Sequence, residues 1–88
     1  MSSIEHIMYR HGPDSGFQGV GRFAGGTSAR DIKGYVDQAL RYGDTSDGAE
    51  FNYDFRRVIG TDRAGNPATQ IRVYVRGGTI RTAFPYGP

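Results

Sequence analysis

The segment ATQIRVYVRGGTIRTAFP, residues 68–85, decides the fold because it encodes a β-hairpin. Apolar and polar residues alternate over residues 71–76 and again over residues 79–84, and this period of two is typical of strands. Gly77 and Gly78 separate the two runs, and a loop of two glycines favours the tight turn that joins antiparallel strands. The sequence therefore predicts two paired strands in this segment.

Each strand of this hairpin is expected to place alternate side chains on opposite faces of the sheet. In the first strand the predicted apolar face holds Ile71, Val73 and Val75, and the predicted polar face holds Arg72, Tyr74 and Arg76. In the second strand the predicted apolar face holds Ile80, Thr82 and Phe84, opposite Thr79, Arg81 and Ala83. The polar face is rich in guanidinium and hydroxyl groups, which are suited to binding phosphate.

The residues before the hairpin predict two helices, a loop and one further strand. A short helix is expected from Ile4 to about Arg10, followed by a glycine-rich loop over residues 12–26. Ser28 is the expected N-cap of a longer amphipathic helix, and residues 51–59 alternate like a strand. We expect one domain, residues 1–88, of the α+β class, with helices packed on one face of a small antiparallel meander of three or four strands.

Composition limits the function classes further. The chain has 88 residues and no cysteine, which excludes disulfide bonds and thiolate chemistry. It shows neither an apolar run of membrane-spanning length nor the apolar core of a signal peptide. Lys+Arg number 11 against 9 Asp+Glu, and Lys33 is the only lysine. Because the arginine fork matches phosphate, an anionic partner is expected, with RNA as the first candidate.

Few catalytic chemistries suit these residues. His6 and His11 are five positions apart, which does not fit a helical metal site, and no GxSxG or Walker motif is present. We therefore expect no metal and no cofactor. Cleavage of RNA needs only a base for the ribose 2′-hydroxyl and groups that stabilise the phosphate, so histidine, arginine and a hydroxyl suffice.

The candidate site residues fall into two groups, and we expect the N-terminal segment and the sheet to bring them together. The expected catalytic residues are His11 as general base, with Arg10, Arg72, Arg81 and Thr82 around the phosphate. The expected substrate-binding residues are His6, Ser15, Tyr74 and Tyr86. Composition and spacing leave open which of the two histidines is the base.

The final strand also resembles a known group of domains. The end Thr82-Ala83-Phe84-Pro85, together with the early Tyr9-Arg10-His11, is similar to the C-terminal toxin domains of bacterial contact-dependent inhibition (CdiA-type) and Rhs polymorphic toxins. Among these, the chain resembles those with the fold shared by barnase, EndoU, colicin D and RelE. One feature departs from the group, because the lysine that several relatives use has no counterpart here, and Arg10, Arg72 or Arg81 would replace it.

The resemblance implies a metal-independent ribonuclease, often one that cuts tRNA, leaving a 2′,3′-cyclic phosphate. It also implies a parent protein that is secreted or delivered by contact, action in the cytoplasm of the target cell, and a cognate immunity protein. Two other hypotheses stay open. The first is a non-catalytic RNA- or protein-binding module that uses the arginine-rich face. The second is a phosphate-binding enzyme that uses the loop 12–26.

Overall fold

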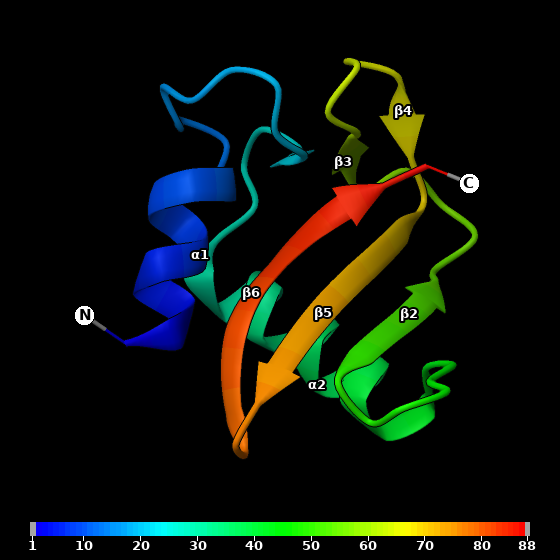
Figure 1. Ribbon diagram of the computed structural model, residues 1–88. Coiled ribbons are helices and arrows are strands. Elements are labelled where there is room, and N and C mark those ends of the chain that lie inside the picture. Colours follow the sequence, from blue (N-terminus) through cyan, green and yellow to red (C-terminus); the bar gives the residue numbers. More distant parts are fainter. Residues whose placement is uncertain (1, 88) are drawn as a thin grey trace.

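The structure, a computed structural model, describes residues 2–87 and belongs to the α+β class (Figure 1). The elements follow in the order α1 (Ser3–His11), β1 (Arg22–Phe23), α2 (Ala29–Tyr42), β2 (Glu50–Asp54), β3 (Gly60–Thr61), β4 (Pro67–Ala68), β5 (Gln70–Arg76) and β6 (Thr79–Tyr86). Both predicted helices and the predicted hairpin are present. The predicted strand 51–59 is shorter than expected, because β2 ends at Asp54.

Both helices begin with a capping box that the sequence encodes. The Ser2 hydroxyl accepts a hydrogen bond from the Glu5 amide, and the Glu5 carboxylate accepts one from the Ser2 amide. Ser28 and Asp31 make the same reciprocal pair at the start of α2. Each pair satisfies two amides that have no partner within the helix, and an N-cap of this kind contributes about 1 kcal/mol.

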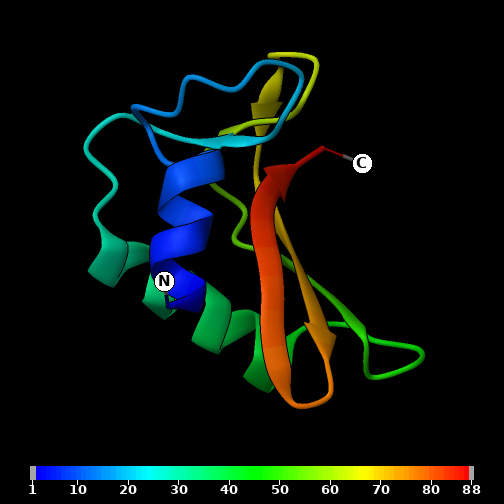
Figure 2. The same cartoon turned by 60° about the vertical axis from the view of Figure 1, so that its left-hand side comes forward.

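The larger sheet has the strand order β2-β5-β6, with every neighbouring pair antiparallel. Gly77 and Gly78 join β5 to β6, and their φ angles of 58° and 77° lie in the left-handed region that a type I′ hairpin turn requires. Helix α1 packs against β6, and α2 packs against β5 and β2. Figure 2 shows both helices on one side of this sheet, which leaves its other side, here called the open face, uncovered.

The core lies between the sheet and the helices, and the strands of the hairpin contribute to it as the alternation predicts. Ile71 and Val73 on β5 are fully buried, whereas Arg72 and Tyr74 lie on the open face. The buried apolar residues that pack together are Ile7, Phe23, Ile32, Val36, Ala39, Ile59, Ile71, Val73 and Ala83. One continuous apolar cluster therefore holds α1, α2 and the sheet together.

The register of the hairpin contains a β-bulge that the sequence pattern does not reveal. Tyr74 pairs with Thr82, but the next residue, Val75, pairs with Ile80, so that Arg81 is an extra residue on β6. A bulge of this kind shifts the alternation of side chains on the strand that carries it. The two halves of β6 therefore place opposite sets of residues on the open face.

The predicted common face of Ile80, Thr82 and Phe84 is wrong because of this bulge. Thr82 and Phe84 are cross-strand partners of Tyr74 and Arg72, so they lie on the open face. Ala83, predicted for the polar face, is instead fully buried in the core. The correction matters for function because it moves Thr82 from the apolar side of the ribbon to the side that carries arginine.

A second, smaller antiparallel sheet was not predicted. It has the order β1-β3-β4, and it forms where the glycine-rich loop 12–26 meets the segment between β2 and β5. In β1, Phe23 pairs with Gly60 and is almost completely buried in the core. This small sheet fixes the glycine-rich loop over one end of the main sheet, at the top of Figure 1.

We expect Val73 to contribute more to the stability of the fold than an exposed valine does, because Val73 is buried in the core. Val73→Ala should lower the free energy of unfolding by about 2 kcal/mol, because it removes buried methyl groups and leaves a cavity. The matched substitution Val58→Ala should cost less than about 0.5 kcal/mol, because Val58 is 56% exposed. Urea denaturation of the two variants measures the difference, and equal losses would contradict this packing.

Candidate functional site

Two neighbouring depressions lie on the open face, and they share three residues. The first depression has a volume of about 630 Å³ and the second about 410 Å³. His11, Tyr74 and Phe84 line both, so these side chains form the boundary between the two. The open face therefore carries a continuous concave surface with a histidine at its middle.

His11 is held in a fixed position at this boundary. Its side chain is only 6% exposed, and its Nδ1 lies 2.7 Å from the carbonyl oxygen of Gly21. Its ring packs against Phe84 on β6, with 5.2 Å between the ring centroids. His11, the last residue of α1, therefore contacts the glycine-rich loop through Gly21 and the last strand through Phe84.

The hydrogen bond to Gly21 determines the tautomer of His11. A carbonyl oxygen only accepts hydrogen bonds, so Nδ1 must carry the proton and donate it. In the neutral ring, Nε2 then keeps its lone pair. Burial lowers the pKa of His11 below its usual value of 6.5, although the hydrogen bond to Gly21 raises it in part. At neutral pH the ring is therefore uncharged and Nε2 is ready to accept a proton.

Gly21 reaches His11 because it has no side chain. A Cβ atom at this position would lie 2.2 Å from the carbonyl oxygen of Pro85 on β6. This distance is too short for any side chain to be accommodated here. The glycine-rich loop therefore approaches the last strand more closely at Gly21 than any other residue would allow. This close approach directs the Gly21 carbonyl oxygen at the imidazole.

The first depression combines His11 with three guanidinium groups. Arg10, Arg76 and Arg81 line it, and no carboxylate of the described residues does. Thr82 also lines it, and the Thr82 hydroxyl oxygen is buried without a hydrogen-bond partner among the described residues. An unsatisfied buried hydroxyl costs about 1–3 kcal/mol, so a ligand oxygen that pairs with it after a change of χ1 rotamer would gain that energy.

The second depression adds the ring of Tyr86 and contains two other arginines, Arg63 and Arg72. Tyr86 and Arg72 line it, and the Arg72 guanidinium lies over the Tyr86 ring at 4.1 Å from the centroid. Arg72 Nε also donates a hydrogen bond of 2.9 Å to the side-chain oxygen of Asn52. The structure thus separates Arg72 from Arg81, which were expected to bind the same phosphate.

Two predicted site residues lie outside both depressions. The Ser15 hydroxyl donates to the Arg10 carbonyl oxygen at 2.6 Å and accepts from the Phe17 amide at 3.2 Å, so it stabilises a turn in the glycine-rich loop. Ser15 lines a separate depression beside Tyr9 and Phe17. His6 lies earlier on α1, is half-buried, and lines neither depression.

Other residues of the site were not among the predicted catalytic or substrate-binding residues. Arg76 lines the first depression, and Asp62 and Arg63 line the second. Gly21 supplies the carbonyl group that orients His11, and Phe84 supplies the ring beneath it. Asp62 and Arg63 lie in a segment whose composition is typical of turns. The carbonyl group of Gly21 belongs to the backbone, so the type of side chain at that position does not indicate its role.

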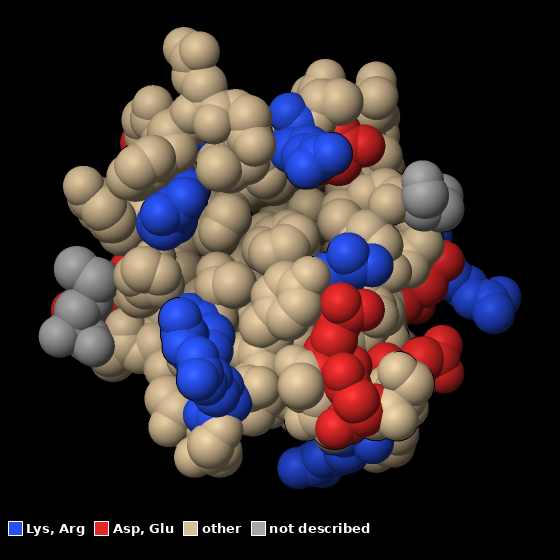
Figure 3. Space-filling view, in the orientation of Figure 1, with Lys and Arg blue, Asp and Glu red and all other residues tan. Residues whose placement is uncertain are grey.

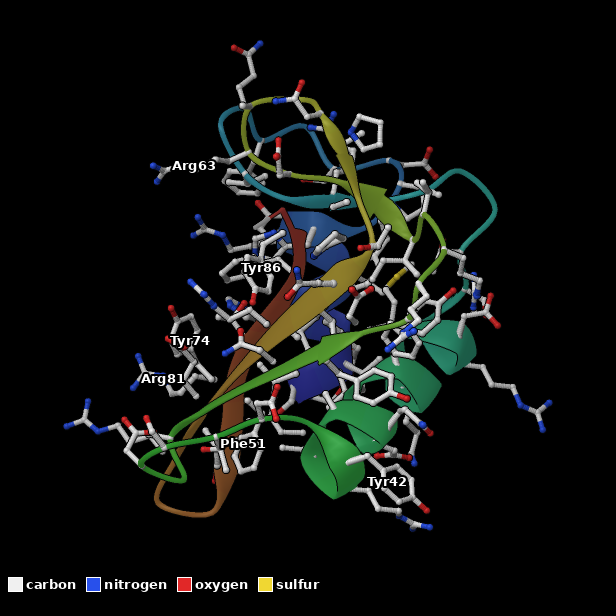
Figure 4. The ribbon with its side chains drawn as sticks, turned by 90° about the vertical axis from the view of Figure 1, so that its right-hand side faces the viewer. Tyr42, Phe51, Arg63, Tyr74, Arg81 and Tyr86 are labelled. Atoms are coloured by element: carbon white, nitrogen blue, oxygen red, sulfur yellow. The ribbon has the colours of Figure 1, made fainter. Side chains whose placement is uncertain are left out.

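The charge on the open face is uneven (Figure 3). Basic side chains lie in separate groups around an uncharged centre, and acidic side chains gather toward one side of the view. In Figure 4, Tyr86, Tyr74 and Arg81 project from the open face of the sheet, and Arg63 projects to the same side from the loop between β3 and β4. Cationic and aromatic groups therefore line one path across the open face, which suits a chain of nucleotides.

Within residues 2–87, no group of three or more His, Asp or Glu side chains is arranged to hold a metal ion. No helix in the same range combines the length and the apolar character needed to cross a membrane.

Comparison of the chain with protein-family models, with curated proteins and with solved structures found no match.

We expect the environment of His11 to be visible in its titration. Burial lowers the pKa, so the ring proton signals should shift with a midpoint below pH 6.5 in the folded protein and near 6.5 in urea. The unfolded chain then binds a proton near pH 6.5 that the folded chain binds only at lower pH. The free energy of unfolding should therefore decrease as the pH falls through 6.5 and level off below the folded pKa.

Nuclear magnetic resonance measures the midpoint, and urea denaturation at several pH values measures the stability. His11→Asn, which keeps a donor for the Gly21 carbonyl oxygen, is the control and should lose this part of the pH dependence. A folded-state midpoint at or above 6.5 would show that the ring is not buried as described.

Proposed function

We propose that this chain is a metal-independent endoribonuclease domain whose catalytic base is His11. The supporting observation is that the Gly21 carbonyl group fixes Nδ1 as a donor and leaves Nε2 as an acceptor. His11 shares the first depression with three arginines and with a threonine hydroxyl that has no hydrogen-bond partner within residues 2–87. A neutral base beside concentrated positive charge is what attack by a ribose 2′-hydroxyl on a phosphate requires.

The proposed reaction uses only side chains of this depression. His11 Nε2 accepts the proton of the 2′-hydroxyl, and the 2′-oxygen forms a bond to the adjacent phosphorus. Arg81, Arg10 and Thr82 stabilise the charge that develops on the phosphate oxygens. The bond from phosphorus to the 5′-oxygen breaks, and this oxygen takes up a proton from the imidazolium or through water. The products are a 2′,3′-cyclic phosphate and a 5′-hydroxyl end.

We further infer that the domain is related to the CdiA-type and Rhs toxin domains with the barnase, EndoU, colicin D and RelE fold. Support comes from the arrangement of the elements, because a histidine at the end of α1 lies against the Thr-Ala-Phe-Pro end of β6. The missing lysine has a substitute of like charge, since Arg10 and Arg81 lie in the same depression as His11.

The relationship would supply the biological setting. RNA, and tRNA in particular, would be the substrate, and a larger protein that is secreted or delivered by contact would carry the domain into the cytoplasm of a target cell. A cognate immunity protein would silence the domain in the producer by covering the open face. The arginines of that face favour an acidic partner.

The direct test is cleavage of purified RNA in the presence of EDTA. We expect the wild-type chain to cut RNA and leave 2′,3′-cyclic phosphate ends, and we expect a strand with 2′-deoxyribose at the cut position to resist. His11→Asn should lower the rate at least 100-fold, because a positioned general base typically contributes a factor of 10² to 10⁴. Thr82→Val, which keeps the shape of the side chain, should lower it about tenfold or more.

Matched variants separate the site from general effects on folding. His6→Asn and Thr79→Val make the same chemical changes outside both depressions and should keep the rate within about twofold. If His11→Asn and Thr82→Val also stay within twofold, the assigned site is wrong. Binding of RNA without any cleavage would instead support the non-catalytic binding module.

A further inference from the structure

The second depression differs in chemistry from the first and is not needed for the bond-breaking step. We propose that it binds the base of an unpaired nucleotide next to the cleaved phosphate, so that the domain takes single-stranded RNA and not duplex RNA. This inference deepens the proposed ribonuclease function and rests on it. It depends on four features of the second depression.

The first feature is a flat cationic and aromatic surface built from Arg72 and Tyr86. The guanidinium of Arg72 lies over the Tyr86 ring at 4.1 Å. Asn52 accepts a hydrogen bond from Arg72 Nε at 2.9 Å, and the carboxylate of Glu50 lies 3.7 Å from the same atom. Because these contacts hold the guanidinium in place, a stacking base would not have to immobilise a free side chain.

The second feature is the continuity of aromatic rings from this surface to the catalytic histidine. The rings of Tyr74 and Phe84 are 6.0 Å apart between centroids, and those of Phe84 and His11 are 5.2 Å apart. Tyr74, Phe84 and Tyr86 all line the second depression. A base lying there would therefore contact the same Phe84 that supports His11, which places its ribose near Nε2.

The third feature is the contrast in charge between the two depressions. Among the described residues, only arginines supply charge to the first, whereas the carboxylate of Asp62 lines the second beside Arg63 and Arg72. Asp62 Oδ1 accepts hydrogen bonds from the amides of Ala64 and Asn66, so the side chain is held in position. A fixed carboxylate repels phosphate, but it accepts hydrogen bonds from the amino groups of bases. The first depression therefore suits phosphate and the second suits a base.

The fourth feature is the direction in which these groups point. Tyr86 and Tyr74 project from the open face of the sheet, with Arg63 at one end and Arg81 at the other (Figure 4). A base within a duplex is stacked between its neighbours and cannot place its face on a protein ring. An unpaired base can, and aromatic stacking is the usual way in which proteins hold single-stranded RNA.

Binding of a strand that cannot be cleaved tests this subsite independently of catalysis. The probe is an eight-nucleotide single strand of mixed sequence with 2′-deoxyribose throughout, and NMR shifts measure its affinity at a fixed salt concentration. Tyr86→Ala should weaken binding about tenfold, the loss expected for one stacked base, and Tyr86→Phe should stay within about twofold of wild type. The probe annealed to its complement should bind at least about tenfold more weakly than the single strand.

The matched control is Tyr42→Ala, since Tyr42 is 63% exposed on α2, away from the open face (Figure 4). Its affinity should equal that of wild type. Equal affinities of Tyr86→Ala and Tyr42→Ala, or equal binding of single strand and duplex, would overturn the proposed subsite. If the wild-type chain still cleaves purified RNA, either of these results would leave the ribonuclease proposal intact. If binding of the probe depends on Tyr86 but purified RNA is not cleaved, the ribonuclease proposal is refuted while the base subsite stands.

Discussion

The hydrogen bond between the His11 ring and the Gly21 carbonyl group joins three parts of the chain at one point. It connects the end of α1 to the glycine-rich loop, and Gly21 is itself pressed against Pro85 of β6. Because one acceptor fixes the proton on Nδ1, the same bond sets the position and the tautomer of the ring. The burial that accompanies it lowers the pKa of His11 and keeps the ring neutral. Location, orientation and protonation of the histidine thus have a common physical origin.

A second constraint, the bulge in β6, decides what surrounds this histidine. If β6 paired regularly, with no bulge at Arg81, Thr82 would continue the alternation that starts at Ile80 and would face the helices. With the bulge, Thr82 lies opposite Tyr74 on the open face and Ala83 fills the core. Bulges occur often beside active sites, where they change the direction in which side chains point.

Local sequence was sufficient to predict the two helices and the hairpin, but not the small sheet or the register of the hairpin. Ser28 and Asp31 predicted the start of α2, and the two glycines at 77 and 78 predicted the turn, because these features depend on neighbouring residues. The alternation in β5 predicted correctly that Ile71 and Val73 are buried. The helices, the hairpin and the buried side of β5 were therefore predictable from short stretches of sequence.

The features that could not be predicted depend on contacts between residues far apart in the sequence. The small sheet β1-β3-β4 forms from strands of two residues each, too short for a periodic pattern to reveal. The bulge is a property of pairing between strands, so neither strand alone encodes it visibly. The candidate site shows the same division. His11 and Thr82 were predicted as site residues from the chemistry of their side chains. Ser15 was also predicted, but its hydroxyl stabilises a turn. The group that orients His11 is the backbone carbonyl of Gly21, which the sequence does not indicate.

A crystal structure of the chain with a bound oligonucleotide that lacks 2′-hydroxyl groups tests the central claim most directly. The claim is that His11, held by Gly21, faces a phosphate on the open face. The account predicts one phosphate in the first depression beside Arg81 and Thr82, with the 2′ position of the preceding nucleotide next to His11 Nε2. A strand bound over the helices, or one whose phosphates all lie away from His11, would contradict it.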